Sequence, residues 1–287
     1  MAGITTATLD APVGAEIRGA DHALLLADPA APEECLEALE HNGVLVFRGL
    51  DVDDDVQIAF SSRLGEVEKV GRGERPEIFR VTLDPAKNPA ARYLRGTFDW
   101  HIDGMTDDIP IKATVLSARQ VAESGGETEF ASTYVAYDLL SEEEKRRFAT
   151  VRVVHTFEAA QRTSNNDPSP EELARWRRVP AKEHPLVWQH RSGRRSLVLG
   201  ATASHVVGMD LDEGQALLAD LLARATAPEY IYRHEWSVGD LVIWDNRGVL
   251  HRACPYDPTS ARDMHRTTLV GDEAVEGIAP SAASALT

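Results

Sequence analysis

The feature that most constrains the fold of this chain is a set of three metal-binding side chain types that stand far apart in the sequence. His101 and Asp103 form a His-x-Asp pair, and His251 lies near the other end. In an extended strand, residues i and i+2 point to the same face, so His101 and Asp103 can hold one ion together. The third ligand must come from elsewhere, and His251 is suited to supply it because it follows an apolar, strand-like run at 240–244.

The three side chains define the chemistry that the fold must accommodate. Two imidazoles and one carboxylate on one face of a metal leave the opposite face open, which is the facial triad of non-haem Fe(II) oxygenases. The same triad could hold Zn(II) and a water, as in a metallohydrolase. A non-catalytic barrel that binds a small acid is a third reading. A His-x-Asp pair also occurs as two polar surface residues of a strand. The pair alone therefore does not establish a metal site, and other features of the chain are needed to distinguish the two readings.

Composition excludes several classes of partner. The 287 residues carry a formal net charge of −16, which argues against nucleic acids and anionic membranes, since both require basic surfaces. A small-molecule substrate remains, including an anion held by a few arginines. Cys35 and Cys254 have no paired spacing, which fits a reducing compartment. Without a signal peptide or an apolar run of about 20 residues, we expect a cytoplasmic protein.

Periodicity predicts a mainly β fold with flanking helices. Apolar residues at helical spacing, with acidic starts, predict helices at 32–40, 51–64, 131–140, 141–148 and 213–225. Short apolar or alternating runs predict strands at 43–47, 77–82, 110–117, 151–156, 184–188, 195–199, 230–236, 241–244, 249–251 and 264–270. Many short strands with ligands near both ends of the strand run favour a cupin-like jelly-roll barrel, in which residues 101 and 251 meet in the mouth.

The domain organisation follows from the same reading. Residues 1–271 are expected to form one domain. The polar segment 160–182, rich in Ser, Asn, Asp and Pro, is expected to be a loop or lid inserted into it. The alanine-rich end, 272–287, is expected to be frayed.

Four segments together resemble the TauD/TfdA family of Fe(II)/2-oxoglutarate-dependent dioxygenases. They are Trp100-His-Ile-Asp103, Gly125-Gly-Glu-Thr-Glu-Phe130, the run from Trp244 to Ala253 that contains His251, and the run from Arg262 to Leu269. Their order and approximate spacing match the family from about residue 10 to residue 272. The resemblance implies a double-stranded β-helix with extra helices, in agreement with the jelly-roll expected from the strand pattern.

The resemblance also assigns roles to individual residues. It implies that His101, Asp103 and His251 are the iron ligands. Thr128 stands where the family's threonine hydrogen-bonds the 2-oxoglutarate carboxylate nearer the metal. Arg262 stands where an arginine pairs with the far carboxylate, a task suited to a guanidinium because its two parallel N–H groups match a carboxylate.

The substrate is less constrained. Arg266 corresponds to the arginine that holds the anionic group of the substrate in taurine dioxygenase, and the basic residues Lys69 and Arg72 are candidates for further substrate contacts. Val70 stands near the position of the histidine that taurine dioxygenase uses for its sulfonate, which argues against taurine. A small anion such as a sulfonate, a sulfate ester or a carboxylate is therefore expected, with an aryloxyalkanoate-like carboxylate or a natural-product or amino-acid intermediate as equal candidates.

The function implied is an oxidoreductase that uses Fe(II), 2-oxoglutarate and O2. It would oxidise, by default hydroxylate, an unactivated C–H bond and release succinate and CO2. The zinc hydrolase and the non-catalytic binder remain the alternatives. The sequence leaves the oligomeric state open, with a homodimer or a homotetramer as the options.

Overall fold

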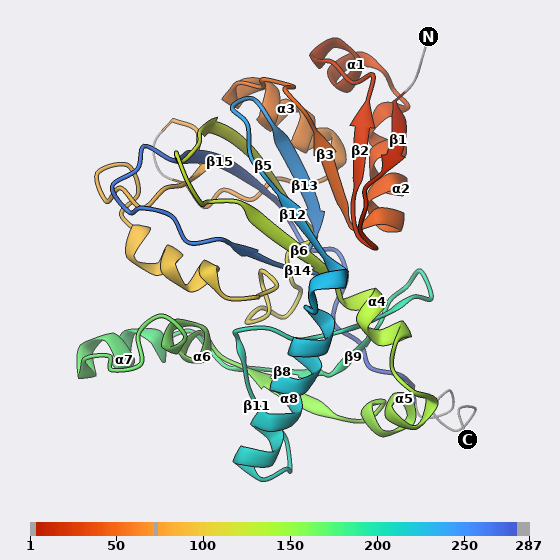
Figure 1. Ribbon diagram of the computed structural model, residues 1–287, viewed down its shortest axis with the longest axis vertical. Helices are drawn as coiled ribbons and strands as arrows, with labels where there is room; N and C mark the ends of the chain where they lie inside the picture. Colours follow the sequence, from red (N-terminus) through yellow and green to blue (C-terminus); the bar gives the residue numbers. More distant parts are fainter. Residues whose placement is uncertain (1–3, 72–73, 280–287) are drawn as a thin grey trace.

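A seven-stranded sheet forms the frame of the molecule in the computed structural model, which describes residues 4–71 and 74–279 (Figure 1). Its strand order is β1-β2-β3-β13-β5-β15-β4. The strands are β1 (Thr5–Thr8), β2 (Ala15–Arg18), β3 (Val44–Phe47), β13 (Leu241–Asp245), β5 (Ala113–Gln120), β15 (Asp263–Leu269) and β4 (Phe79–Val81). The central strands β3 and β13 are apolar almost throughout, which fits their burial on both faces, and the first six residues of β5 are buried as well.

A three-stranded sheet faces the inner side of this frame. It contains β12 (Ile231–His234), β6 (Thr128–Ser132) and β14 (Val249–Ala253), in that order. Phe130 and Val249 from the small sheet form one apolar cluster with Leu116, Val242 and Trp244 of the frame. Alternation along the strands directs these side chains into the space between the two sheets. The mainly β class is thus confirmed, whereas the strand pairing of the described residues closes no barrel.

Helices cover the outer side of the frame. They are α1 (His22–Ala27), α2 (Ala31–Asn42) and α3 (Asp54–Leu64), and their apolar residues share a second cluster with β3, β5 and β13. Asp53 caps α3 by accepting from Val56 N, and Gly43 (φ 73°) ends α2. The helices predicted at 32–40 and 51–64 are confirmed.

The third part of the molecule lies on the side of β6 away from α1 to α3 (Figure 1). It is built from α4 (Thr133–Asp138), α5 (Glu142–Phe148), α6 (Phe157–Arg162), α7 (Pro170–Trp176), α8 (Leu211–Ala225), the sheet β11-β7-β8 (Ala203–Val206, Arg152–His155, Lys182–Pro185) and the hairpin β9-β10 (Val187–Gln189, Arg195–Leu197). Two short 3-10 helices, η1 (Ala91–Phe98) and η2 (Pro228–Tyr230), complete the elements. The capping box expected at Ser141 is present, with Glu144 as its partner.

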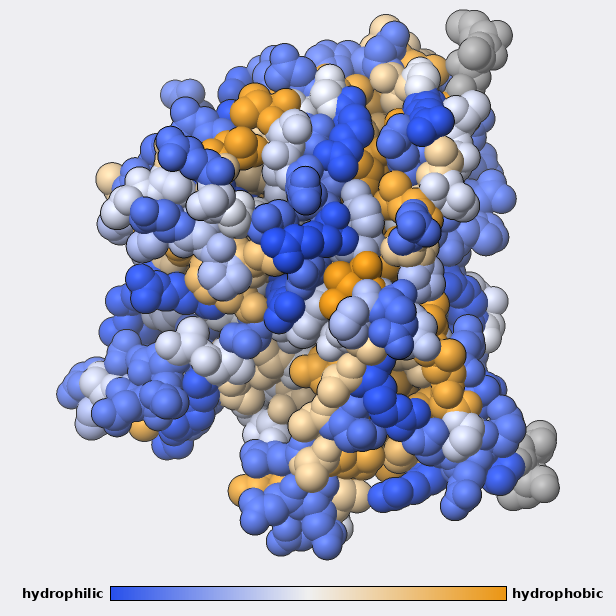
Figure 2. Space-filling view, viewed as in Figure 1, coloured by the Kyte–Doolittle hydropathy of each residue, from blue (hydrophilic) through white to orange (hydrophobic). Residues whose placement is uncertain are grey.

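Two sequence expectations need correction in this part. The segment 160–182 is not irregular: it holds the end of α6, all of α7 and the start of β8, and a second capping box, Ser169 with Glu172, starts α7. The polar composition that suggested a loop belongs to a solvent-surrounded helix pair, which projects as a mostly hydrophilic lobe in Figure 2.

The second correction concerns the C-terminal end. Residues 272–279 have no regular secondary structure, but they are packed rather than frayed. Glu273 accepts a hydrogen bond from Arg191 N at 2.7 Å, Gln189 N donates to Glu276 O at 2.8 Å, and Ile278 is 7% exposed within the core of the third part. Residues 280–287 lie outside the described residues. Among the described residues, no helix has the length and apolar character needed to cross a membrane.

Candidate metal centre and cosubstrate site

The backbones of His101 and His251 pair directly. They form an isolated antiparallel bridge in which His101 N donates to His251 O at 3.1 Å and His251 N donates to His101 O at 2.9 Å. In such a pair the two side chains lie on the same side, and their ring centroids are 4.2 Å apart. Gly200 makes room for this approach, because a Cβ at its position would lie 2.9 Å from His101 Cα. The tertiary fold therefore joins the two predicted histidines.

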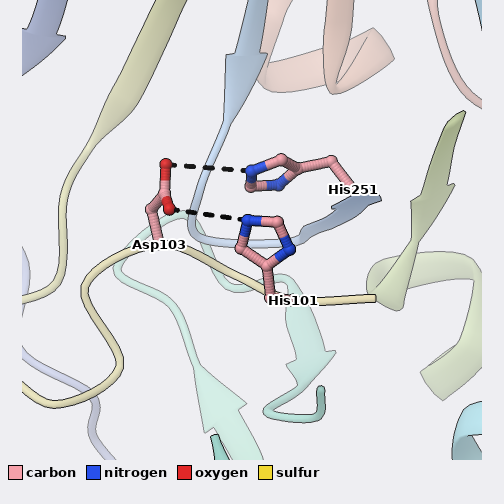
Figure 3. Close-up of side chains that lie close together, drawn as sticks. All are labelled: His101, Asp103 and His251. Carbon is pink, nitrogen blue, oxygen red and sulfur yellow. Dashed lines mark ion pairs between the residues drawn. The ribbon is translucent and has the colours of Figure 1, made fainter. Parts of the chain in front are cut away.

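Asp103 completes the cluster from a turn rather than from a strand. Gly104 has φ +82°, and a Cβ there would lie 2.6 Å from Ile111 N, so this turn requires glycine. The Asp103 carboxylate lies 3.7 Å from His101 Nε2 through Oδ1 and 3.7 Å from His251 Nε2 through Oδ2 (Figure 3). The three candidate ligand atoms all lie within 4.8 Å of one another. The expected strand geometry of residues 101–103 was wrong, but the shared face was right.

Protonation prepares both imidazoles to act as ligands. His101 Nδ1 lies 2.8 Å from Asp99 O, so Nδ1 carries the proton and the Nε2 lone pair is free. Burial, with the neighbouring His101, lowers the pKa of His251 to about 3 and keeps it neutral. Burial would raise the pKa of Asp103, but Arg266 and the two imidazoles outweigh it and hold that pKa below its usual range. Two imidazole nitrogens and one carboxylate oxygen are a donor set that suits Fe(II).

A polar chain supports Asp103 from behind. Trp244 Nε1 donates to Asn246 Oδ1 at 3.2 Å, and Asn246 Nδ2 donates to Thr114 Oγ1 at 2.9 Å. With an acceptor position of its hydroxyl filled, Thr114 directs its proton to Asp103 Oδ2, 3.4 Å away. The sequence singles out the run 244–253, which contains Trp244 and Asn246, but it gives no sign of this role for Thr114, which lies within the strand predicted at 110–117.

Arg266 reaches the cluster from β15. Its NH1 lies 3.4 Å from Asp103 Oδ2, and its guanidinium lies 4.8 Å from the centroid of the Phe79 ring. Its buried Nε has no hydrogen-bond partner among the described residues. The predicted substrate arginine therefore stands beside the candidate ligands with donor capacity to spare.

Arg262 is a buried cation. It is 2% exposed, its guanidinium lies 4.8 Å from the centroid of the Tyr256 ring, and no carboxylate of the described residues forms an ion pair with it. Gly126 (φ +77°) leaves the space for the arginine, because a Cβ there would lie 3.0 Å from Arg262 Nε. Burial lowers the pKa of this guanidinium, although an arginine keeps its charge. A buried cation without an anion is what a carboxylate-binding site requires before its ligand arrives.

Thr128 lies on the same inner face as His251. In the pairing of β6 with β14, Thr128 stands opposite Ala253 and Phe130 stands opposite His251. Thr128 is therefore a diagonal neighbour of His251, and such neighbours are about 7–8 Å apart. The predicted positions of Thr128 and the metal ligands agree with a single site between the two sheets.

Of the other two predicted substrate residues, the structure describes only Lys69, and it does not bring this side chain to the site. The Lys69 side chain is 69% exposed and its Nζ lies 3.7 Å from Glu77 Oε1. Arg72 lies outside the described residues. A residue of the same segment that was not predicted, Glu68, lies closer to the site. Glu68 N donates to Thr268 O at 2.9 Å, and Thr268 stands two residues after Arg266 on β15. Nothing in the local sequence distinguishes Glu68 from its charged neighbours. Only its pairing with β15 shows that Glu68 lies near Arg266.

Comparison with known proteins agrees with this geometry. The family model described as "Taurine catabolism dioxygenase TauD, TfdA family" matches residues 5–268. An alpha-ketoglutarate-dependent 2,4-dichlorophenoxyacetate dioxygenase of Burkholderia sp. (strain RASC) is 38% identical over 259 residues, which cover 85% of this chain and 86% of that protein. An (S)-phenoxypropionate/alpha-ketoglutarate-dioxygenase of Sphingobium herbicidovorans is 34% identical and covers 94% of this chain and 96% of that protein. The crystal structure of AAD-2 in complex with Mn(II) and N-oxalylglycine superposes with a TM-score of 0.81 at 31% identity and covers 95% of this chain and 99% of that one.

These comparisons show a 2-oxoglutarate-dependent dioxygenase, an oxidoreductase; alpha-ketoglutarate is another name for 2-oxoglutarate. The chain belongs to the TauD/TfdA family.

Proposed function

We propose that this dioxygenase holds Fe(II) through His101, Asp103 and His251 and oxidises a small anionic substrate. The observation that carries the proposal is the convergence of the three ligand atoms within 4.8 Å of one another, and the buried cation Arg262, which has no ion-pair partner among the described residues, supports it. When bound, the iron would supply the activation of O2 that couples conversion of 2-oxoglutarate into succinate and CO2 to oxidation of a C–H bond. Hydroxylation is the default outcome.

The chain's own residues would bind and orient the reactants. Arg262 would hold one carboxylate of 2-oxoglutarate with its guanidinium fork, and the hydroxyl of Thr128 would donate to a carboxylate oxygen. The buried position of both residues would exclude water from the cosubstrate. Thr114 would keep the carboxylate of Asp103 oriented toward the metal.

Arg266 would hold the anionic group of the primary substrate. Its position beside Asp103 and its unpartnered Nε support this role, since binding of the metal would weaken the hold of Asp103 on the guanidinium. The named substrates of the two relatives, 2,4-dichlorophenoxyacetate and phenoxypropionate, are carboxylates on an aryloxy group. We infer a carboxylate of this kind as the first class to test, ahead of sulfonates and sulfate esters.

The architecture supports two further parts of the proposal. The two facing sheets would form the double-stranded β-helix of a single domain, residues 1–271. The segment 160–182, which contains α7 and the end of α6, would close over the site. It contacts the 3-10 helix that leads to the ligand segment, with Arg175 NH1 donating to the Tyr93 hydroxyl at 3.2 Å. Deleting the segment should raise the ratio of succinate to oxidised product, and an unchanged ratio would remove the lid from the proposal.

The test of the metal site is anaerobic addition of Fe(II) and 2-oxoglutarate to the apoprotein. We expect a weak charge-transfer band in the visible spectrum, lost in His101→Ala and weakened in Arg262→Ala. The same band should persist in Arg224→Ala, which removes an arginine that takes no part in the proposed site. Arg224 lies on the surface of α8 and pairs with Glu144 of α5. A folded, metal-loaded protein without the band would favour the zinc hydrolase. A protein that binds 2-oxoglutarate but consumes none of it with any substrate would favour the non-catalytic binder.

The two cysteines support a reducing compartment, the cytoplasm. Both Cys35 and Cys254 are buried and unpaired.

A further inference from the structure

A tryptophan donates a hydrogen bond to the threonine proposed to bind 2-oxoglutarate. Trp236 Nε1 lies 2.9 Å from Thr128 Oγ1. The indole N–H is a donor only, so Thr128 must be the acceptor in this bond. A threonine hydroxyl has one proton to donate, and Thr128 donates it to none of the described residues.

This bond restricts where the Thr128 proton can point. Thr128 is 4% exposed, so a proton left without an acceptor would cost free energy. With the Trp236 side of the oxygen occupied, the proton is directed away from the indole. Phe130, the next residue on the same face of β6, stands opposite His251, so this face is the one turned toward the candidate metal ligands.

Trp236 itself is held in a fixed orientation. The ring of His234 contacts it edge to face, with centroids 4.4 Å apart and an interplanar angle of 83°. His234 is fully buried, and its Nδ1 lies 3.0 Å from the Tyr232 hydroxyl while its Nε2 lies 3.3 Å from Asp240 Oδ2. Asp240 in turn accepts from Ser237 N at 3.0 Å.

A second strand anchors this chain of contacts. Arg48 NH1 donates to Asp240 Oδ2 at 2.7 Å, and Gly49 N donates to Asp240 Oδ1 at 3.0 Å. Both follow β3 of the frame, so the contacts that fix the indole extend from the segment 234–240 to the end of β3. Such fixed outer contacts are the means by which proteins orient the groups that bind a ligand.

We propose that Trp236 is a positioning residue for 2-oxoglutarate, which acts by fixing the hydroxyl rotor of Thr128 so that its proton is donated to a carboxylate oxygen of the cosubstrate. The proposal rests on the proposed function, in which Thr128 contacts 2-oxoglutarate. It goes beyond that function because it assigns a role to a residue that does not touch the cosubstrate.

The test is a double-mutant cycle on the binding of 2-oxoglutarate to the Mn(II)-loaded full chain. Titration calorimetry measures the Kd of each variant. Thr128→Val removes a hydrogen bond to a charged group and should raise the Kd for 2-oxoglutarate by about 10-fold or more. Trp236→Phe keeps an aromatic ring but removes the donor, and should raise the Kd by about 3–10-fold. In the Thr128→Val background, Trp236→Phe should have no further effect, because the rotor on which it acts is gone.

Trp188→Phe is the matched control. Trp188 is 1% exposed, and its Nε1 has no hydrogen-bond partner among the described residues. The same chemical change there removes no donor contact and should leave the Kd unchanged. If Trp236→Phe fails to fold, replacement of Trp236 by 3-benzothienylalanine keeps the bicyclic shape and removes only the N–H.

The outcomes separate the proposal from the function on which it rests. A wild-type Kd in the Trp236 variant, or an equal loss with and without the Thr128 hydroxyl, would overturn the positioning role. A wild-type Kd in Thr128→Val would overturn both the cosubstrate role of Thr128 and the role of Trp236. That result would leave the metal triad to be judged by the charge-transfer band alone.

Discussion

Replacing Arg262 by methionine should stabilise the protein without ligand and abolish most of its affinity for 2-oxoglutarate. The guanidinium is 2% exposed and has no ion-pair partner among the described residues. Without the cosubstrate it is therefore a buried charge that no carboxylate neutralises, and the Tyr256 ring, 4.8 Å from the guanidinium, offsets only part of the cost of desolvation. Methionine has a similar length and no charge, and it would fill the same space beside Gly126 and Tyr256.

The two effects have opposite signs and can be estimated separately. Replacement of buried ionic groups by apolar residues of similar volume is often neutral or stabilising by about 1–4 kcal/mol, and we expect a gain within this range in the free energy of unfolding of the apoprotein. Loss of one partner of a buried, hydrogen-bonded charge pair costs about 2–5 kcal/mol, which corresponds to a rise in the Kd for 2-oxoglutarate of about 30-fold to several thousand-fold.

Thermal unfolding with and without Mn(II) and 2-oxoglutarate measures both effects. Ligand raises the free energy of unfolding by RT ln(1 + [L]/Kd). The Arg262→Met variant should therefore be more stable than wild type without ligand and should gain less stability when 2-oxoglutarate is added. Arg224→Met is the control, because the Arg224 side chain is 43% exposed and pairs with Glu144. It should change stability by about 1 kcal/mol or less and leave the ligand-induced gain unchanged. A destabilised apoprotein that still gains as much as wild type from 2-oxoglutarate would refute the reasoning.

Three further predictions concern the ligand support, the substrate and pH. Thr114→Val removes the donor to Asp103 and should weaken metal binding by about 10-fold in a competition assay with a chelator, whereas wild-type affinity would refute its supporting role. Arg266→Gln should abolish the stimulation of succinate release by aryloxy carboxylates while the Kd for 2-oxoglutarate stays the same, and a parallel loss of both would place Arg266 in the cosubstrate site instead. Burial, with a contribution from His184, lowers the pKa of His155 from 6.5 to about 3. Because the unfolded chain then binds a proton that the folded chain does not, stability should fall as the pH drops from about 6.5 toward about 3. Urea unfolding at pH 7 and pH 5 should show a loss about 2 kcal/mol smaller in His155→Asn than in wild type, and equal losses would contradict the assignment.

Local patterns in the sequence were sufficient for the elements whose stability is local. The helix at 54–64 could be predicted because an aspartate cap and apolar residues at helical spacing lie within one segment. The strand at 44–47 could be predicted because it is apolar throughout. The segment 160–182 was misread because its helix α7 spans only seven residues and carries just two large apolar side chains, Leu173 and Trp176, although its capping box, Ser169 and Glu172, was present in the sequence.

For the site, too, the sequence determined some features, namely the chemical types of its side chains. The types of side chain determined the chemistry before any fold was known: two histidines and an aspartate suit an open iron site, and an arginine suits a carboxylate. The motif spacing also indicated the family, which the comparisons confirm.

Only the tertiary structure decided which residues share the site. The backbone bridge between His101 and His251, the glycine turn after Asp103 and the pairing of Glu68 with β15 all depend on contacts between distant segments. The same holds for the hydrogen bond from Trp236 to Thr128 and for the exposure of Lys69. A sequence states the chemical type of each side chain, but distance, burial and hydrogen-bond direction are properties of pairs of residues. In this chain those pairs join segments that lie far apart in the sequence, such as residues 101 and 251.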